Sequence, residues 1–354
     1  MKLTDIINSF HKLGEEIRAF LANSPVHQDW NNAIQLAEHQ NGWFTRANIL
    51  LAFQGIETWL HKDKLVKWLS AYPELPKENT KPITISVVMA GNIPLVGFHD
   101  FLCVLITGNT IQAKLSSSDV TLLKFLAKKL IAINPELEKH IQFVEKLSSS
   151  ANAVIATGSN NTARHFEYYF RNTPNIIRRN RNGVAILDGS ETSEEIGNLG
   201  NDIFTYFGLG CRNVSKLYIP QDFELSQFFL GIEKFRDVVN HNKYANNYTY
   251  NRTIFLMDGK VFTDNNFLAV IEDKTIPSPI AVLHFERYKD LAALSKELSE
   301  QKELIQCIAA KDSVAKKLKN LSIPVVGLGE TQSPTLSDYA DGVDVIKFIL
   351  SKKT

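Results

Sequence analysis

The sequence predicts an α/β protein made of two doubly wound domains behind a helical N-terminal segment. Three observations carry this prediction: a helical apolar stripe near the N-terminus, short apolar runs alternating with helices after Pro82, and a second such series after residue 182. Strands of a parallel sheet are buried on both faces and therefore read as continuous apolar runs. We accordingly divide the chain into a helical segment (1–75), a first α/β domain (76–180) and a second α/β domain (181–354).

Composition and charge narrow the class of protein. The 354 residues are 44% hydrophobic and 22% charged, an ordinary globular balance, and 39 basic residues face 38 acidic ones. A net charge of +1 provides no field for holding nucleic acid. Three cysteines are too few for a disulfide framework or a zinc site, so we expect no metal. No secretory signal or membrane span is recognisable, and we expect a cytoplasmic protein.

The N-terminal segment is expected to be helical. Apolar residues recur at three-to-four spacing from Leu3 to Phe20, which is typical of one buried helix face. Thr45 is placed to cap a second helix that runs to about Leu60. The stretch 73–82 is rich in proline and charge and predicts a connector.

The expected elements after this connector alternate between strand and helix. The first domain is predicted to contain strands at 83–89, 110–115, 141–147 and 153–157 and helices at 96–106, 118–133 and 161–170. Ser118 and Asp119 are expected to cap the second of these helices. The second domain is predicted to contain a helix at 193–207 and strands at 183–188, 214–219, 281–285, 304–309, 324–328 and 345–350.

Cys211 is the strongest candidate for chemistry. It follows Gly208-Leu209-Gly210 in the loop between a helix and a strand, where glycines permit tight turns and close approach of a substrate. A thiol nucleophile needs such a loop, with its pKa lowered by backbone N–H groups or by a neighbour such as Arg212. The alternative is a structural cysteine, which we favour for Cys103 and Cys307 inside apolar runs.

Other candidates follow the strands of the first domain. Asn92 lies in the turn that follows the strand 83–89, where its amide could donate to an oxyanion, although asparagine is also a common turn residue. Gly158 and Ser159 open a helix whose N-terminus suits a pyrophosphate, or they form an ordinary capped turn. Lys114 and Ser116 could face ribose or phosphate, or remain solvated beside a helix.

Two further groups are weaker candidates. Arg178, Arg179 and Arg181 form the densest basic cluster and could hold a phosphate, although such a run is more often a solvated loop. We predict that substituting Arg178 or Arg179 raises the Michaelis constant of an anionic ligand. His99 and Asp100 could handle protons as a pair, but adjacent residues on a helix seldom face each other.

Taken together, these segments resemble the acyl-CoA reductase family (LuxC-type) of the aldehyde dehydrogenase superfamily. The resemblance extends from about Trp43 to the C-terminus. It rests on the segments MAGNIPLVGFHDFL (89–102), GNTIQAKLSSSD (108–119), ATGS (156–159), FGLGCRNVSKLYIP (207–220) and YADGVDVIKFIL (339–350).

The resemblance implies specific roles and a fold of the aldehyde dehydrogenase type. Cys211 would be the acyl-accepting nucleophile of domain 181–354, and Asn92 would belong to the oxyanion hole. In the Rossmann-like domain 76–180, which would bind the nicotinamide dinucleotide, Lys114 would approach the adenosine ribose. Gly158 and Ser159 would lie at the pyrophosphate, and Ser116 is added as a further cofactor contact.

The resemblance also implies a reaction, the reduction of an acyl thioester to an aldehyde. The glutamate that activates water in hydrolytic aldehyde dehydrogenases has no counterpart in 175–180, which favours thioester chemistry over release of a free acid. Oxidation of an aldehyde to an acid and a non-catalytic cofactor-binding homologue remain the alternatives. The expected cofactor is NADPH, with NADH left open, and the thioester partner is acyl-CoA or an acyl-carrier protein. Acyl chain and oligomeric state stay open, and neither Glu272 nor Asp273 is assigned as the acidic residue at the nicotinamide ribose.

Overall fold

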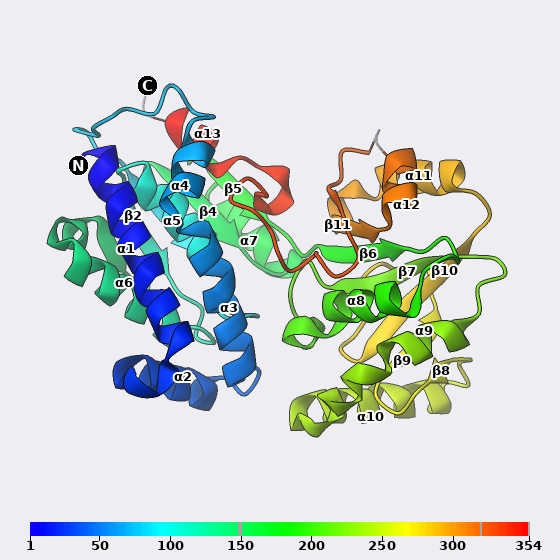
Figure 1. Ribbon diagram of the computed structural model, residues 1–354. Helices are drawn as coiled ribbons and strands as arrows, with labels where there is room; N and C mark the ends of the chain where they lie inside the picture. Colours follow the sequence, from blue (N-terminus) through cyan, green and yellow to red (C-terminus); the bar gives the residue numbers. More distant parts are fainter. Residues whose placement is uncertain (148–150, 319–320, 353–354) are drawn as a thin grey trace. The chain divides into compact units, whose positions relative to one another are not determined.

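The computed structural model describes residues 1–147, 151–318 and 321–352, and its chain divides into two units (Figure 1). Unit 1 comprises Met1–Arg179 and Thr335–Thr354, and unit 2 comprises Asn180–Pro334. The C-terminal segment therefore returns to the first unit.

Unit 1 is a five-stranded parallel sheet with helices on both faces. Its strands are β1 (Thr84–Val88), β2 (Thr110–Lys114), β3 (Ile141–Phe143), β4 (Ala153–Thr157) and β5 (Asn175–Arg178), in the order β3-β2-β1-β4-β5. Its helices are α1 (Leu3–Ala22), α2 (Gln28–Gln40), α3 (Arg46–Trp59), α4 (Lys62–Leu69), α5 (Phe98–Ile106), α6 (Thr121–Ile133), α7 (Asn160–Tyr169) and α13 (Val345–Leu350). Short 3₁₀ helices are η1 (Ser24–Val26), η2 (Pro135–His140) and η7 (Ala340–Gly342).

The helical N-terminal segment is confirmed. In α1 the predicted apolar stripe is buried, with Phe10 and Phe20 fully inaccessible to solvent. The predicted cap of α3 is present, because the Thr45 side chain accepts a hydrogen bond from the Asn48 backbone N–H at 3.3 Å. These helices share one hydrophobic core with α5, α6 and α13.

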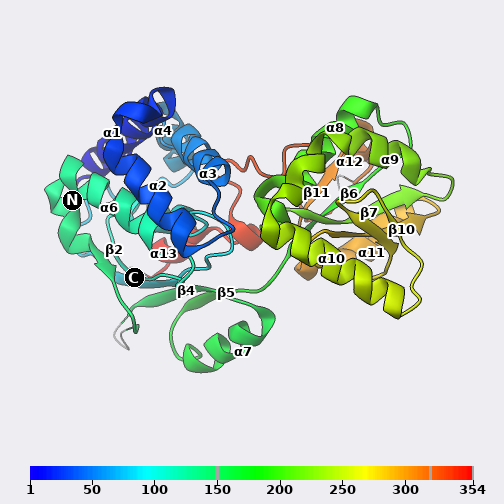
Figure 2. The same cartoon turned by 90° about the horizontal axis from the view of Figure 1, so that it is seen from below.

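The order of strands creates a switch point in unit 1. From central β1 the chain moves outward through β2 to β3, then returns to place β4 on the other side of β1. Figure 2 shows α7 on the opposite side of β4 and β5 from α1, α2 and α6. Ligands of open α/β sheets bind outside the carboxyl ends of the strands at such a point. In this unit it lies between the ends of β1 and β4.

Two expectations for unit 1 are wrong, and one strand was not predicted. Residues 345–350 form helix α13 rather than a strand, because Asp344 caps the segment by accepting from the Lys347 N–H at 3.0 Å. Its buried residues Val345, Ile346 and Ile349 also recur at helical spacing. Ser118 and Asp119 do not cap α6, which begins after Val120 without a side-chain cap. Strand β5 was unpredicted.

Unit 2 is a seven-stranded sheet. Its strands are β6 (Asn182–Ile186), β7 (Val214–Pro220), β8 (Thr263–Asp264), β9 (Ala269–Glu272), β10 (Val282–Tyr288), β11 (Ile305–Ala310) and β12 (Val325–Val326), in the order β12-β11-β6-β7-β10-β9-β8. Its helices are α8 (Ser193–Phe204), α9 (Leu225–Ile232), α10 (Asn242–Met257), α11 (Leu291–Glu300) and α12 (Asp312–Ala315). Its 3₁₀ helices are η3 (Thr205–Gly208), η4 (Glu233–Asn240), η5 (Lys302–Leu304) and η6 (Lys316–Leu318).

Unit 2 is also doubly wound. All its strand pairs are parallel except β8 with β9, and α11 and α12 cover the opposite face of the sheet from α8, α9 and α10 (Figure 1). Helix α8 begins with a capping box, in which Thr192 and Glu195 exchange side-chain and backbone hydrogen bonds. The predicted α/β class is therefore confirmed for both units. Among the described residues, no helix has the length and apolar character that crossing a bilayer would require.

Candidate active site

Four predicted residues gather at the carboxyl edge of the unit 1 sheet. Asn92 follows β1, Ser116 follows β2, and Gly158 and Ser159 follow β4. The last residues of these strands lie in register, with Val88 opposite Lys114 on one side and Ala156 on the other. The three connections therefore leave the sheet side by side, at the switch point.

Close packing joins the first two of these connections. A Cβ added at Gly91 would lie 2.6 Å from both the Cβ and the Oγ of Ser116, so that only glycine fits there. The side chains of the adjacent Asn92 and of Lys114 are exposed. The edge thus presents an amide, an ammonium and a hydroxyl over a small distance along the sheet.

Asp119 holds the turn that carries Asn92. Its Oδ2 accepts from the Leu95 backbone N–H at 2.7 Å, and Leu95 has a left-handed backbone with φ of 59°. This contact explains why Asp119 does not cap α6. Its Oδ1 is buried without a hydrogen-bond partner among the described residues. Burial raises the pKa of Asp119 to about 7, and the Leu95 N–H opposes this shift only in part.

Gly158 and Ser159 form a capped strand-to-helix turn. The Ser159 Oγ accepts from the Thr162 N–H at 3.2 Å and therefore caps α7. A Cβ at Gly158 would lie 3.0 Å from the Thr162 side chain and 3.1 Å from the Phe166 ring. The turn thus brings bare backbone to the N-terminus of a helix at the switch point, an arrangement that fits a pyrophosphate.

Arg178 is engaged inside unit 1, contrary to the hypothesis that it holds a phosphate. Its guanidinium donates to both carboxylate oxygens of Asp100, at 2.5 and 2.9 Å, and both side chains are buried. Burial disfavours the charge, but the Asp100 carboxylate overcomes this and holds the pKa of Arg178 above its ordinary value. The Arg178 carbonyl also accepts from the Gly158 N–H at 3.2 Å. Its structural role is to link three segments of this edge.

The other arginines of the cluster have different partners. Arg179 forms an exposed ion pair with Glu167 at 2.6 Å, and Arg181 pairs with Glu303 at 3.0 Å in unit 2. Each of the three arginines therefore pairs with its own acidic residue.

His99 and Asp100 do not act as a pair. Asp100 is bound to Arg178, whereas the His99 Nε2 lies 3.0 Å from the Leu336 carbonyl oxygen, to which it donates. Burial lowers the pKa of His99, so the ring is neutral at pH 7. The histidine therefore fastens the C-terminal segment of unit 1.

Cys211 occupies a β-turn at the amino end of β7 in unit 2. The turn spans Gly210 to Asn213 and is closed by the Asn213 N–H, which donates to the Gly210 carbonyl at 3.0 Å. Cys211 is partly exposed, whereas Cys103 and Cys307 are buried, and none of these three described cysteines is in a disulfide. Of the three thiols, that of Cys211 therefore belongs to the one residue that is accessible to solvent.

A strained segment precedes this turn. Tyr206, Phe207 and Gly208 have φ values of 53°, 57° and 78°, three consecutive left-handed residues. For a residue other than glycine this conformation costs about 1–2 kcal/mol. Helix α8 therefore ends at Phe204 instead of continuing to residue 207. Such strain persists only where surrounding contacts fix it, and it is frequent at functional sites.

The Cys211 turn is packed tightly against β6. A Cβ at Gly183 would lie 2.4 Å from the Arg212 carbonyl oxygen and 2.9 Å from that of Asn213. The Arg212 Nε donates to the Thr331 carbonyl at 2.6 Å. Arg212 is therefore fixed by the segment after β12, and the turn has contacts on two sides.

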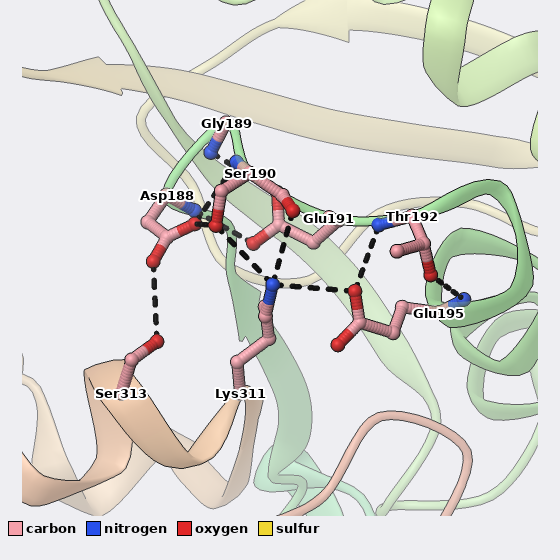
Figure 3. Close-up of polar contacts among 8 residues, drawn as sticks. All are labelled: Asp188, Gly189, Ser190, Glu191, Thr192, Glu195, Lys311 and Ser313. Atoms are coloured by element: carbon pink, nitrogen blue, oxygen red, sulfur yellow. Dashed lines mark hydrogen bonds and ion pairs between the residues drawn. The ribbon is translucent and has the colours of Figure 1, made fainter.

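The opposite, carboxyl edge of the unit 2 sheet is filled by its own side chains (Figure 3). Lys311 donates to the carbonyl and hydroxyl oxygens of Ser190 at 3.0 and 3.2 Å and pairs with Glu195 at 3.2 Å. Burial alone would raise the pKa of Asp188, but hydrogen bonds from Ser190 and Ser313 hold it below its ordinary value. Each charge here has an internal partner, so this edge is a structural network.

Sequence reasoning missed the residues that support the two turns. Asn213, Gly183 and Asp202 were not singled out, and Asp119 was interpreted as a helix cap. An asparagine directly before a strand is a recognisable turn residue, and this signal could have identified Asn213.

Asp273 was not assigned as the acidic residue at the nicotinamide ribose. In the structure its carboxylate accepts from the Thr275 N–H and hydroxyl, both at 2.7 Å.

Comparison with known families gives one match. A sequence model described as acyl-CoA reductase (LuxC) matches residues 29–227, which include Asn92, Lys114, Ser116, Gly158, Ser159 and Cys211. The family resemblance read from the sequence is thereby confirmed. A comparison with curated proteins finds no match.

Solved structures show the same fold. Aldehyde dehydrogenase 21 from Physcomitrella patens, in complex with succinate, aligns over 99% of this chain and 84% of its own, with a TM-score of 0.70 and 12% identity. An NAD+ complex of aldehyde dehydrogenase from Bacillus cereus aligns over 93% of this chain and 76% of its own, with a TM-score of 0.66 and 12% identity. An NADP-dependent enzyme of E. coli aligns over 93% of this chain and 82% of its own, with a TM-score of 0.60 and 13% identity. At these identities the likeness shows the fold alone, and it confirms the predicted aldehyde-dehydrogenase-like architecture.

Proposed function

Because the chain belongs to the acyl-CoA reductase (LuxC) family of NAD(P)-dependent oxidoreductases, we propose that it reduces an acyl thioester to an aldehyde through an acyl-enzyme on Cys211. The observation that carries the proposal is the partly exposed thiol of Cys211, held in a closed turn within the segment that the family match covers. Buried Cys103 and Cys307 offer no comparable nucleophile.

The first chemical step forms the acyl-enzyme. The Cys211 thiolate attacks the thioester carbonyl carbon, and a C–S bond forms as the carbonyl π electrons move to oxygen. The tetrahedral oxyanion then collapses, the bond to coenzyme A breaks, and its thiolate takes a proton from solvent. The acyl group remains as a thioester on Cys211.

The second step is reductive. The bound cofactor, when reduced, supplies a hydride to the thioester carbon. The oxyanion that forms collapses to the aldehyde, and the electron pair of the broken C–S bond returns to the Cys211 sulfur. The sum consumes one hydride and one proton for each aldehyde and thiol released.

Asn92 and the Cys211 backbone N–H serve as oxyanion donors in this proposal. Both tetrahedral species place negative charge on the former carbonyl oxygen, and each preorganised donor in comparable sites contributes about 2.7–4 kcal/mol. Support comes from the exposed position of Asn92 after β1 and from the turn geometry at Cys211.

The carboxyl edge of unit 1 would hold the dinucleotide. Gly158, where an added Cβ would be tightly packed at 3.0 Å from the Thr162 side chain, and the N-terminus of the ten-residue α7 fit the pyrophosphate. Exposed Lys114 and neighbouring Ser116 would contact the adenosine ribose. NADPH is the proposed cofactor, and NADH is its competitor in the test below.

The segment before unit 2 supports thioester chemistry over acid formation. Strand β5 and the residues after it, Asn175-Ile-Ile-Arg-Arg-Asn180, contain no glutamate to activate water. A coenzyme A thiolate needs no such base, because it is already nucleophilic in the reverse reaction. The donor is acyl-CoA or an acyl-carrier protein, and the three scattered cysteines of the sequence fit the reducing cytoplasm, where we place the reaction.

Mass spectrometry tests the covalent step. Protein incubated with acyl-CoA in the absence of cofactor should gain one acyl group on the peptide that contains Cys211, and the Cys211→Ser variant should gain no thioester there. A modified Cys103 or Cys307 peptide, or an unmodified protein, would overturn the scheme.

Product analysis separates the reactions. Oxidation of NADPH that depends on acyl-CoA and yields aldehyde supports the proposal, and NADH in parallel reactions decides the cofactor. Free acid formed from aldehyde without coenzyme A would support an ordinary aldehyde dehydrogenase. Cofactor binding without turnover of either substrate would support a non-catalytic homologue.

A further inference from the structure

The side chain of Asn213 supports the Cys211 turn of unit 2, which spans residues 210–213 and is called the nucleophile turn from here on. It is 1% exposed, and its amide makes three hydrogen bonds of ordinary length. The Oδ1 accepts from the Gly210 N–H at 2.8 Å, while the Nδ2 donates to the carbonyls of Asp202 at 2.8 Å and Thr205 at 2.9 Å. The amide therefore uses both its donor and its acceptor on backbone groups.

These partners bracket the strained segment. Asp202 and Thr205 lie before Tyr206, Phe207 and Gly208, and Gly210 lies after them. The amide of Asn213 thus ties the start of the left-handed run to its end. The same residue also closes the turn through its backbone N–H, so Asn213 holds the path of residues 205–213 at several points.

A second anchor acts through Asp202. Its carboxylate accepts from the Gly329 N–H at 2.6 Å and from the Thr331 N–H and hydroxyl at 2.9 and 2.8 Å. Thr331 in turn accepts from Arg212, which follows the cysteine. The turn is therefore held at Gly210 by Asn213 and at Arg212 by Thr331, and Cys211 lies between these two fixed points.

We propose that Asn213 is the positioning residue of the nucleophile: its amide sets the orientation of the Cys211 thiol and backbone N–H for attack on the thioester. This inference rests on the proposed function. Asn213 does not contact substrate in the proposal. It acts by holding a strained backbone, and that backbone holds the reacting atoms.

Two variants separate positioning from simple support of the fold. Asn213→Ala removes the whole amide, whereas Asn213→Asp keeps an acceptor for the Gly210 N–H but sets a carboxylate oxygen against the Asp202 and Thr205 carbonyls. Asn251→Ala is the matched control, because Asn251 is another buried asparagine of unit 2 with one backbone partner, the Ile280 carbonyl at 2.9 Å.

Each variant is assayed well below its melting temperature. We measure the rate constant of Cys211 acylation by acyl-CoA without cofactor, the KM for acyl-CoA, and the rate of alkylation by iodoacetamide. Misplacement by about 1 Å can cost about 100-fold in rate. We therefore expect acylation to fall by about 10–100-fold in both Asn213 variants, with KM and alkylation changed by less than about threefold.

The pH dependence of Asn213→Asp provides a conservative rescue. A protonated carboxyl can again donate to one carbonyl, so its acylation rate relative to wild type should rise as the pH is lowered, whereas that of Asn213→Ala should not. Acylation equal to wild type in folded Asn213 variants would overturn the inference. The inference would also be overturned if the Asn213 variants lost acylation and alkylation rate to the same extent, and if Asn251→Ala, at an equal melting temperature, showed the same losses. Absence of an adduct in the wild-type protein would instead refute the proposed function.

Discussion

The turn of Asn92 in unit 1 and the turn of Cys211 in unit 2 are built at opposite ends of their sheets. Asn92 follows β1 at a carboxyl edge, whereas Cys211 precedes β7 at an amino edge. The Asn92 turn contains one left-handed residue other than glycine, Leu95, and two such residues, Tyr206 and Phe207, precede the Cys211 turn. In each case a buried polar side chain, Asp119 or Asn213, holds the backbone.

The two anchors differ in how completely their hydrogen bonds are satisfied. Asn213 is bonded through both ends of its amide, whereas one oxygen of the Asp119 carboxyl has no partner among the described residues. Burying a carboxyl group with an unpaired oxygen costs more free energy when the group is ionised than when it is protonated, so the strength of this anchor depends on pH. The Asn213 amide is therefore an anchor that does not titrate, whereas Asp119 is a titratable one.

The largest expected effect tests whether the unit 1 edge depends on its buried ion pair. Arg178→Ala leaves the Asp100 carboxylate buried without its partner, which typically costs about 3–5 kcal/mol in the free energy of unfolding. Arg179→Ala breaks only an exposed pair and should cost less than about 1 kcal/mol. Urea denaturation of both variants measures the difference.

A double variant sharpens this test. Asp100→Ala combined with Arg178→Ala should cost less than the sum of the single changes, because no buried charge remains unpaired. A stable Arg178→Ala protein with only a raised KM for an anionic ligand would instead restore a phosphate-binding role for this arginine.

The second effect concerns the proposed oxyanion donor. Asn92→Ala should lower kcat by about 10²–10³-fold with little change in KM, because the contact is made to charge that develops in the transition state. The acyl adduct should still map to Cys211. Exposed Asn246→Ala serves as the control and should leave kcat unchanged. An equal kcat for Asn92→Ala and wild type would leave the backbone N–H at Cys211 as the remaining donor.

The third effect tests the close packing beneath the cysteine turn. Gly183→Ala places a methyl group 2.4 Å from the Arg212 carbonyl, and such overpacking typically costs about 1–3 kcal/mol. Gly55→Ala in α3 has no atom within 4 Å of the new methyl group and should stabilise the protein by about 0.5–1 kcal/mol. Thermal unfolding should therefore show changes of opposite sign. A neutral Gly183→Ala would indicate that β6 and the turn separate easily.

Local pattern predicted most of the regular structure. The strand at 153–157 has the predicted bounds, since a continuous apolar run enclosed by turn residues leaves little choice. The strand predicted at 345–350 was wrong because an apolar run of six residues fits a strand as well as a helix. The N-cap formed by Asp344 favours the helix.

For the candidate site, the sequence alone led us to propose only residues that would touch substrate or cofactor. Cys211, Asn92 and Gly158 stand in recognisable loops after or before strands. Asp119 and Asn213 act through contacts with Leu95 and Thr205, and no local pattern encodes which distant backbone group a polar side chain will meet. Supporting residues therefore require the folded chain.

The smallest effect tests the titratable anchor directly. Because burial raises the pKa of folded Asp119 from 3.8 to about 7, the folded protein binds more protons than the unfolded chain between these values. Stability due to this group is thus full at low pH and declines as the pH rises toward 7. Asp119→Asn keeps an acceptor for the Leu95 N–H but carries no charge, so its Tm relative to wild type should be higher at pH 8 than at pH 5. Exposed Asp63→Asn should show no such change in offset between the two pH values. A constant offset for Asp119→Asn would mean that the carboxyl stays ionised throughout, and that the Asp119 anchor depends on pH no more than the Asn213 amide does.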